Sequence, residues 1–331
     1  MVRRDEPARS RPRSPRVIGA PVTAALAIAV LGCGGGGHSN PTDAGGSDGA
    51  IDAPPPPPWW QPKVSEVKNW DIQLSGTIDV SMPRLMYDLD LWALVPAQTM
   101  IDYGDGAPVT VPAGALAGKI AELHARTPKT MVICHVETGA LEANRPDAKK
   151  FPAGVTGDPV PGLAMGRFLD VSATGRAKWA SVMFKRFDLA KQIGCDGVEP
   201  AHNDVASYIS GLSISSEDSY SWYAEVAKQG HMRELSTGMK DGDLLGGQLD
   251  ASDDKFDWLM LERCGEFQTC DAVMPFLTLH KAVFAIDYNR DVDGNVQGST
   301  IVCQNQRTPG IADGIFKDVA LTSGTWTSCS P

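Results

Sequence analysis

The segment 194–208, GCDGVEPAHNDVASY, constrains the fold more than any other part of the sequence. It begins with small and apolar residues, as a buried strand does, and a helical pattern of apolar residues at 177–193 precedes it. Four polar residues then follow within six positions: Glu199, His202, Asn203 and Asp204. A helix leading into a strand with a polar carboxyl end is typical of a βα-barrel, in which chemistry takes place at the carboxyl ends of the strands. An acidic helix cap or a solvated loop would give the same pattern, so the segment alone leaves both interpretations open.

Apolar runs of strand length recur along the chain and alternate with helical stretches. Strands are predicted at 70–76, 85–94, 129–136, within 194–208, and at 235–240, 258–262, 282–287 and 320–326. Helices are predicted at 115–126, 177–193, 216–229 and 311–321, and a long polar loop at 137–169. Such alternation predicts a parallel sheet covered by helices. No glycine-rich phosphate loop follows the first strand. About eight strand–helix units therefore favour an α/β fold with a single (β/α)8 TIM barrel over an open sheet.

The first 32 residues have the form of a bacterial export signal. Six arginines lie within 1–16, and the apolar segment 17–31 that follows is short for a membrane span of about 20 residues. The run ends in Val-Leu-Gly-Cys at Cys33, which resembles a lipobox. We therefore expect a lipoprotein signal peptide at 1–32, with cleavage before Cys33 and lipidation of its thiol. A secretory signal with an incidental cysteine is the alternative.

Residues 33–58 are rich in glycine and end in five prolines. This composition offers too little apolar surface to repay the entropy of ordering, and it predicts a disordered tether that ends in a stiff polyproline spacer. The remaining residues, 59–331, have the usual length of one α/β barrel. We therefore expect an exported barrel held by a lipid on the cell envelope, either at the outer surface or on the periplasmic side.

The charge balance of the chain is acidic. Residues 1–32 carry six positive and two negative charges, so their removal changes the formal net charge from −10 to −14. Binding to nucleic acid phosphates requires a basic surface, and we therefore expect no nucleic acid partner. An acidic chain is compatible with a neutral or cationic substrate. We expect a monomer whose contact with the membrane is through the lipid anchor alone.

Six cysteines remain when Cys33 is assigned to the lipid, and an even number in an exported chain permits disulfides. Cys264 and Cys270 are close enough in sequence to close a small loop, and Cys303 with Cys329 is the expected second pair. Cys134 and Cys195 lie in apolar, strand-like runs, where we favour buried free thiols. No Cys-x-x-Cys or His-x-x-x-His pair predicts a zinc site, so no metal ligands are assigned.

Polar side chains gather where the predicted strands end. They are Gln73, Asp88, Asp90, His135, Glu137, Glu199, Asp204, Lys240, Glu262, Asp287 and Tyr288. Hydrolysis of a glycosidic bond requires two carboxyl groups that face each other across the bond, of which one protonates the leaving oxygen and the other attacks or activates water. Acids at the ends of most strands of a barrel meet this requirement.

Several motifs occur together in an informative order. They are WDIQLSG at 70–76, Asp88-Leu89-Asp90, CHVETGALEANRPDAKKFP at 134–152, Phe168-Leu169-Asp170, Gly197-Val198-Glu199-Pro200, Leu261-Glu262-Arg263-Cys264 with Cys270, and Asp287-Tyr288. In this combination the chain from Trp60 onward resembles glycoside hydrolase family 114, the endo-α-1,4-polygalactosaminidases. The resemblance implies a barrel that hydrolyses α-1,4-linked galactosamine polymers without a metal or other cofactor.

The resemblance also implies a catalytic pair, made of the Glu of a Glu-x-Cys motif and an Asp after the fourth strand. The Glu corresponds to Glu262. After Glu-Pro the family pattern is Asp-Asn-x-Asp, and Ala201 stands where the first Asp is expected, while Asp204 matches the second. We expect Glu262 to be the general acid, with a raised pKa, and Asp204 or Glu199 to supply the second carboxyl.

Two alternatives remain for this departure. The chain binds a polysaccharide without cleaving it, as a surface lipoprotein on a hydrolase barrel, or its chemistry has changed with the participation of His202. The substrate-binding residues expected around the pair are Gln73, Asp88, Asp90, His135, Glu137, Lys240, Asp287 and Tyr288. For Lys240, anchoring of an acid and exposure to solvent are both open. For Arg145 and Asp147, a mutual ion pair and sugar contact are both open.

Overall fold

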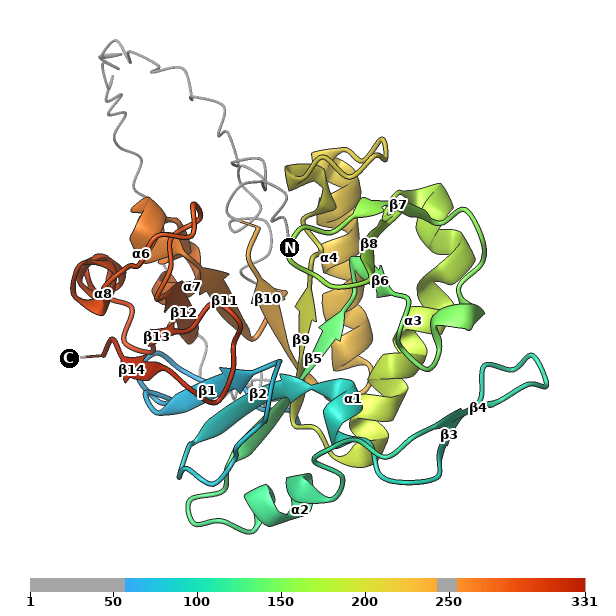
Figure 1. The fold of residues 1–331 in the computed structure, drawn as a ribbon, viewed down its shortest axis with the longest axis horizontal. Coiled ribbons are helices and arrows are strands. Elements are labelled where there is room, and N and C mark those ends of the chain that lie inside the picture. The colour runs from blue at the N-terminus through green and yellow to red at the C-terminus, as the bar shows by residue number, and fades with distance from the viewer. Residues whose placement is uncertain (1–56, 243–254, 331) are drawn as a thin grey trace, which may run out of the picture. The chain divides into compact units, whose positions relative to one another are not determined.

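Eight parallel strands and one antiparallel strand form the central sheet of the computed structural model, which describes residues 57–242 and 255–330 (Figure 1). The strands in their spatial order are β1 (Trp70–Gln73), β2 (Met86–Asp90), β5 (Met131–Glu137), β9 (Gly197–Ala201), β10 (Ser236–Lys240), β11 (Trp258–Glu262), β12 (Val283–Tyr288), β13 (Ile315–Lys317) and β14 (Trp326–Ser328). Neighbouring strands follow one another in the sequence, and only β14 runs antiparallel. This order is that of a TIM-like barrel.

The sheet comes close to full closure through contacts between its two edges. The Trp326 indole N–H donates to the Trp70 carbonyl at 2.8 Å, and the Leu74 N–H donates to the Leu321 carbonyl at 2.9 Å. No strand ladder joins β14 to β1 in the part of the chain that the structure describes. The structure is therefore a nearly closed, barrel-like sheet with a seam between its first and last strands.

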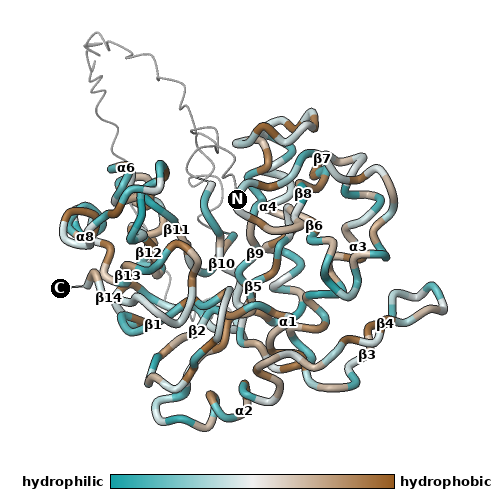
Figure 2. Tube along the Cα trace, viewed as in Figure 1, coloured by the Kyte–Doolittle hydropathy of each residue, from teal (hydrophilic) through white to brown (hydrophobic). Residues whose placement is uncertain are grey.

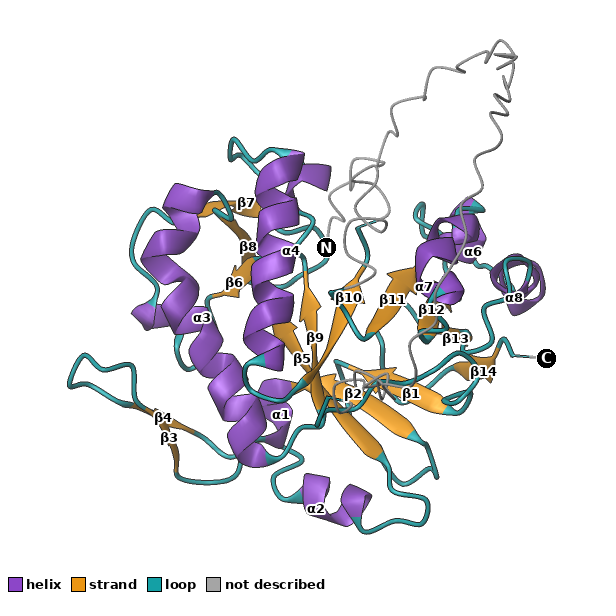
Figure 3. Ribbon diagram, turned by 180° about the vertical axis from the view of Figure 1, so that it is seen from behind, coloured by secondary structure: helices purple, strands orange, loops and turns teal. Residues whose placement is uncertain are grey.

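Helices cover the outside of the sheet (Figure 3). They are α1 (Leu91–Leu94), α2 (Lys119–His124), α3 (Ala173–Ile193), α4 (Ser216–His231), α6 (Cys264–Phe267), α7 (Met274–Thr278) and α8 (Ser299–Arg307), with 3-10 turns at Ala148–Lys150, Val205–Ser207 and Cys270–Val273. The helix α3 begins at the Ser172 cap and ends at Gly194, whose φ of 97° suits glycine. A capping box between Ser215 and Asp218 starts α4.

Two apolar layers hold these elements together. Inside the barrel, Trp70, Trp258 and Phe284 pack with the aliphatic side chains of the strands. Outside it, Trp179 of α3 and Trp222 of α4 pack edge to face in the layer between the helices and the sheet. Figure 2 shows hydrophobic and hydrophilic residues alternating along both helices, because one side of each faces this layer.

Several predicted elements differ from the structure. The strand expected at 320–326 is wrong, since the last strand, β14, begins only at Trp326, and the strand expected at 85–94 ends at Asp90, where α1 begins. The helix expected at 311–321 is wrong: this stretch contains β13, and the last helix is α8. The expected loop at 137–169 contains a small antiparallel sheet in the order β6 (Ala140–Glu142), β8 (Gly166–Leu169) and β7 (Thr156–Pro159). Its strands are three or four residues long, which is too short to show a clear hydrophobic period. A further hairpin, β3 (Thr99–Ile101) with β4 (Val109–Val111), follows α1.

Three disulfides cross-link the described chain. The expected pairs Cys264–Cys270 and Cys303–Cys329 are confirmed. The free thiols expected at Cys134 and Cys195 are wrong, because these residues form a third disulfide with a Cα–Cα distance of 6.0 Å. Cys195 lies two positions before β9, and β9 pairs with the strand that carries Cys134. Their sequence separation of 61 concealed this proximity.

The N-terminal expectations lie outside the described residues, apart from the last two prolines. They are the signal peptide at 1–32, the lipidated Cys33 and the tether at 33–58. Within the described residues, no helix has the length and apolar character needed to span a membrane. Trp59 stacks on His231 of α4 at 4.4 Å between ring centroids, and its indole N–H donates to Asp257 at 3.0 Å, so the barrel domain begins with a packed residue.

We predict that the Cys134–Cys195 disulfide contributes more to the free energy of unfolding than the Cys264–Cys270 disulfide, which closes the shortest loop. Replacement of Cys134 and Cys195 by Ala should lower the free energy of unfolding by about 4 kcal/mol, because the cross-link closes a long loop in the unfolded chain. Replacement of Cys264 and Cys270, only six residues apart, should cost about 2 kcal/mol. Urea unfolding of both double variants measures the difference, and equal losses would contradict the prediction.

Candidate active site

A row of side chains with alternating charge crosses the carboxyl end of the sheet. In spatial order these residues are His202, Glu137, His135, Glu199, Lys240 and Glu262, which we call the charge row. The successive contacts are His202 Nδ1 to Glu137 Oε2 at 2.5 Å, Glu137 Oε1 to His135 Nε2 at 3.1 Å, His135 Nδ1 to Glu199 Oε2, Glu199 Oε1 to Lys240 Nζ at 3.0 Å, and Lys240 Nζ to Glu262 Oε1 at 3.1 Å. Each charge in the row is therefore next to one of opposite sign.

The parallel sheet assembles this row from four neighbouring strands. His135 and Glu137 are two positions apart on β5, so their side chains lie on the same face of the sheet. Glu199 on β9 is in register with His135, and β10 and β11 supply Lys240 and Glu262 at their last positions. Because parallel strands end at the same edge, residues that are far apart in the sequence meet here.

The turn after β9 brings His202 back to Glu137. His202 has a left-handed backbone with φ of 57°. Asn203 fixes the turn, since its amide donates to the Pro200 carbonyl at 2.9 Å and accepts from the Thr138 hydroxyl at 2.6 Å. Gly139 must be glycine, because a Cβ at this position would lie 1.7 Å from the His202 carbonyl oxygen.

Burial divides the charge row into an interior and two ends. Glu199 has no exposed surface, and its neighbours in the row are almost as deeply buried. The side chains of His202 and Glu262 are 24% and 29% exposed, respectively. A buried charge is costly unless it is paired, and the alternating order supplies that pairing. Only the two ends of the row can therefore touch a large ligand in this conformation.

The charge row also controls the protonation of its own side chains. Burial alone would raise the pKa values of Glu137 and Glu199, but the positive neighbours outweigh burial, holding the pKa of Glu137 well below its usual value and that of Glu199 at about 2. Burial alone would lower the pKa values of the two histidines. Their carboxylate neighbours outweigh it, so the pKa of His135 lies well above its usual value and that of His202 is about 9. His202 is therefore charged at neutral pH in this arrangement, and the protonated form of His135 is favoured.

The pKa of Glu262 differs from our expectation. Burial tends to raise it, but Lys240 and a hydrogen bond from Tyr288 lower it below its usual value. The raised pKa expected for a general acid is therefore wrong. The cause is the ammonium of Lys240, which lies at the end of β10 and contacts both Glu199 and Glu262. Of the two alternatives left open for Lys240, anchoring of an acid is therefore the one found in the structure.

Asp241 is an acid of the opposite character beside Glu262. Its Oδ1 accepts the Glu262 backbone N–H at 2.9 Å. Burial and the negative charge of Glu262 raise the pKa of Asp241 well above its usual value, and Asp204 adds to this effect. Asp204 is itself buried, and its charge also acts on His202. Glu262, Asp241 and Asp204 thus form a group of neighbouring carboxyls in which the pKa of Glu262 is lowered and the pKa of Asp241 is raised.

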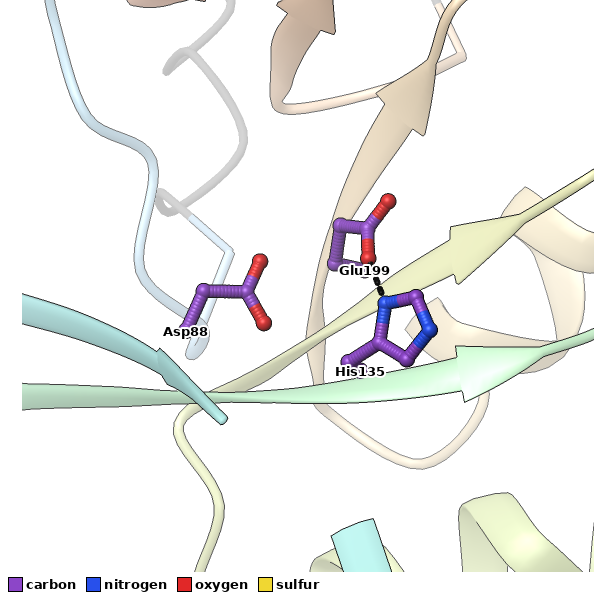
Figure 4. A group of neighbouring side chains, drawn as sticks. All are labelled: Asp88, His135 and Glu199. Atoms are coloured by element: carbon purple, nitrogen blue, oxygen red, sulfur yellow. Dashed lines mark hydrogen bonds and ion pairs between the residues drawn. The ribbon is translucent and has the colours of Figure 1, made fainter. Parts of the chain in front are cut away.

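Asp88 lies beneath the row with its carboxyl group directed toward His135 and Glu199 (Figure 4). It is fully buried, and neither of its oxygens has a hydrogen-bond donor among the described residues. Burial, followed by the nearby charge of Glu199, raises the pKa of Asp88 well above its usual value.

Other expected site residues have structural partners. Gln73 donates to Asp71 at 2.9 Å and to the Asp79 carbonyl at 2.8 Å. Asp90 caps α1 through the Trp92 N–H. Asp287 accepts from the backbone N–H groups that begin α6 and from the Gln306 amide. The carboxylates and the amide at these three positions therefore hold loops in place in the structure.

The possible ion pair between Arg145 and Asp147 is not formed. Arg145 lies 2.7 Å from Asp90 and 2.6 Å from Glu142. Asp147 instead accepts from Arg186 of α3 at 2.8 Å. Arg145 thus links the first loop of the small antiparallel sheet to the end of β2.

Sequence reasoning missed two ionisable residues at this end of the barrel. Asp241 could have been found, since it directly follows the strand-end Lys240. Lys317 was hidden, because its stretch was assigned to a helix. Its side chain is fully buried, and its ammonium donates to Asp71 at 2.6 Å and to the Thr322 carbonyl at 2.8 Å.

We predict a pH dependence of stability that originates at His202. Because its folded pKa is about 9 against an ordinary value of 6.5, its contribution is complete below pH 6.5 and is lost as the pH rises through 9. The wild type should lose about 3 kcal/mol of unfolding free energy across this window relative to His202→Gln. Urea unfolding at pH 6 and pH 10 measures the change, and parallel behaviour of the two proteins would contradict the prediction.

Comparison with known proteins gives two kinds of match. The family model described as Glycoside-hydrolase family GH114 matches residues 50–330. No curated protein sequence matches the chain. Two solved structures share its fold. The Ega3 protein of Aspergillus fumigatus, in complex with galactosamine, is 24% identical with a TM-score of 0.65, over 82% of this chain and 97% of that one. The glycoside hydrolase domain of PelA from Pseudomonas aeruginosa is 12% identical with a TM-score of 0.52, over 79% and 98%.

Proposed function

The chain belongs to glycoside-hydrolase family GH114, and we propose that it hydrolyses α-1,4 bonds in a galactosamine-containing polysaccharide. The observation that carries the proposal is the group of neighbouring carboxyls at the exposed end of the charge row. The pKa of Glu262 is lowered and that of its neighbour Asp241 is raised well above its usual value, which favours the ionised form of Glu262 and the protonated form of Asp241. Glycosidic hydrolysis requires one carboxyl group in each of these states.

We assign the ionised role to Glu262. A carboxylate held by Lys240 and Tyr288 can attack the anomeric carbon or remove a proton from water. A neutral carboxyl must protonate the leaving oxygen, and the raised pKa of Asp241 suits this role. Asp204, the partner expected from the sequence, lies close enough to influence the pKa of Asp241, and it remains the second candidate for the acid.

Glu199 has a different role in this proposal. It has no exposed surface, and its two oxygens face His135 and Lys240, so a sugar cannot reach it in this conformation. It acts as a positioning residue, because its negative charge holds Lys240 next to Glu262. The catalytic role expected for Glu199 is thus replaced by an indirect one.

The substrate class is supported by the charge of this end of the barrel. Glu262 places a negative charge at its exposed edge, and an amino sugar without an N-acetyl group is a cation at neutral pH. The structural relative Ega3 was solved in complex with galactosamine. We further propose that the protein acts as a monomer outside the cytoplasm, held by a lipid on Cys33, on the strength of the export pattern of residues 1–33.

Glu262→Gln should abolish reducing-end release from partially deacetylated α-1,4-galactosaminogalactan. The expected loss in kcat/KM is about 10³-fold or more, because an amide can neither attack the sugar nor activate water. Glu234→Gln, which alters an exposed ion pair with Lys191 of α3 just before β10 begins, is the control and should retain full activity. No release by the wild type, together with retained binding of the polymer, would favour the non-catalytic alternative. Ala201, which supplies no carboxyl at the end of β9, is the observation behind that alternative.

The pH dependence of kcat/KM identifies the residue that acts as the general acid. Activity should rise with pH as Glu262 ionises below pH 4.5 and fall as Asp241 loses its proton well above pH 3.8, which gives a bell-shaped kcat/KM. Asp241→Asn should lower kcat/KM by about 10²-fold or more and remove the alkaline limb. Asp204→Asn is the matched variant and should keep that limb. Loss of the limb in Asp204→Asn alone would assign the acid to Asp204.

A further inference from the structure

Two buried acceptor oxygens at the floor of the charge row lack hydrogen-bond donors in the described part of the chain. They are the two carboxyl oxygens of Asp88. Oε1 of Glu199 is buried beside them, and its partner is the Lys240 ammonium at 3.0 Å. Buried polar atoms without partners are rare in native proteins, and an unseen ion is one of their common explanations.

The imidazole of His135 completes a compact set of donors with these oxygens. One ligand atom from each of Asp88, His135 and Glu199 lies within 4.8 Å of the other two. The three residues come from the neighbouring parallel strands β2, β5 and β9, and Figure 4 shows their side chains converging. From this geometry, we propose that Asp88, His135 and Glu199 bind one divalent transition-metal ion.

The surroundings of His135 fit this role. Its Nε2 lies 3.1 Å from Glu137, which leaves Nδ1 directed at Glu199. Metal-binding histidines usually donate their second N–H to a carboxylate or carbonyl in this way. The ion takes the place of the proton between Nδ1 and Glu199 Oε2, and that proton passes to solvent. One nitrogen and two carboxylate oxygens suit zinc or manganese.

Burial restricts what can occupy the site. Asp88 and Glu199 have no exposed surface, so a small cation fits and a sugar does not. The ammonium of Lys240 repels the ion, but Glu262 lies 3.1 Å away on its other side and offsets this charge. The competing occupant is a proton on Asp88, which neutralises the carboxyl without any metal. Metal content distinguishes the two directly.

Zinc binding to the purified full-length protein tests the site. After dialysis against EDTA, the wild type should take up about one equivalent of zinc that survives gel filtration, measured by elemental analysis. Saturating zinc should raise the melting temperature by about 5 °C, since the ion binds the folded state alone. These readouts do not require hydrolysis, so they stand or fall independently of the proposed activity.

Two variants and a control separate this site from adventitious binding. Asp88→Asn should weaken zinc binding more than about 100-fold, because outer-shell partners alone contribute about 10- to 100-fold. His135→Gln should do the same if Asp88→Asn fails to fold. Asp313→Asn is the matched control, since Asp313 is also fully buried with one oxygen lacking a donor in the described structure, and it should bind zinc as the wild type does. No zinc uptake by the wild type, or equal uptake by Asp88→Asn, overturns the proposal.

Discussion

The position of Lys240 between two carboxylates is the interaction on which the rest of the site depends. Its ammonium lies 3.0 Å from Glu199 and 3.1 Å from Glu262, and it thereby joins the fully buried part of the charge row to its exposed end. Without this cation, Glu199 would be paired with His135 alone, and Glu262 would lose the main attraction that keeps it ionised. A single side chain at the end of β10 therefore links the stability of the barrel interior to the reactivity at its mouth.

The sequence predicted those features of the fold that repeat along the chain. The parallel barrel followed from apolar runs alternating with helices, and Trp258–Glu262 agrees with the predicted strand at both ends. The predictions failed where the decisive contacts are distant in sequence. The Cys134–Cys195 disulfide spans 61 residues, and the short strand β13 gives no periodic signal. The sequence pattern could show that acids lie at the strand ends, but not which of them would have a raised pKa.

The roles of the acids in this site depend on their pKa values, which the residue types in the sequence do not determine. Glu262 and Asp241 are both acids at strand ends, yet their pKa values move in opposite directions because only Glu262 contacts Lys240 directly. Glu199 matched a family motif, but its complete burial makes it a support for Lys240. The residue that departs from the family pattern, Ala201, precedes a turn that delivers His202 to Glu137. The local change in sequence thus coincides with an added positive charge at one end of the row.

The antiparallel strand β14 has a consequence for where this protein can work. Cys329 directly follows β14, and its disulfide to Cys303 fastens that strand to α8. The Trp326 side chain of β14 donates a hydrogen bond to β1, but no strand ladder joins β14 to β1 among the described residues. The disulfide therefore adds a covalent connection beside the seam of the barrel-like sheet. Reduction of the disulfide would remove the covalent attachment of β14 to α8 and leave this strand held by noncovalent contacts, among them its antiparallel pairing with β13. The covalent attachment of β14 therefore depends on an oxidising environment.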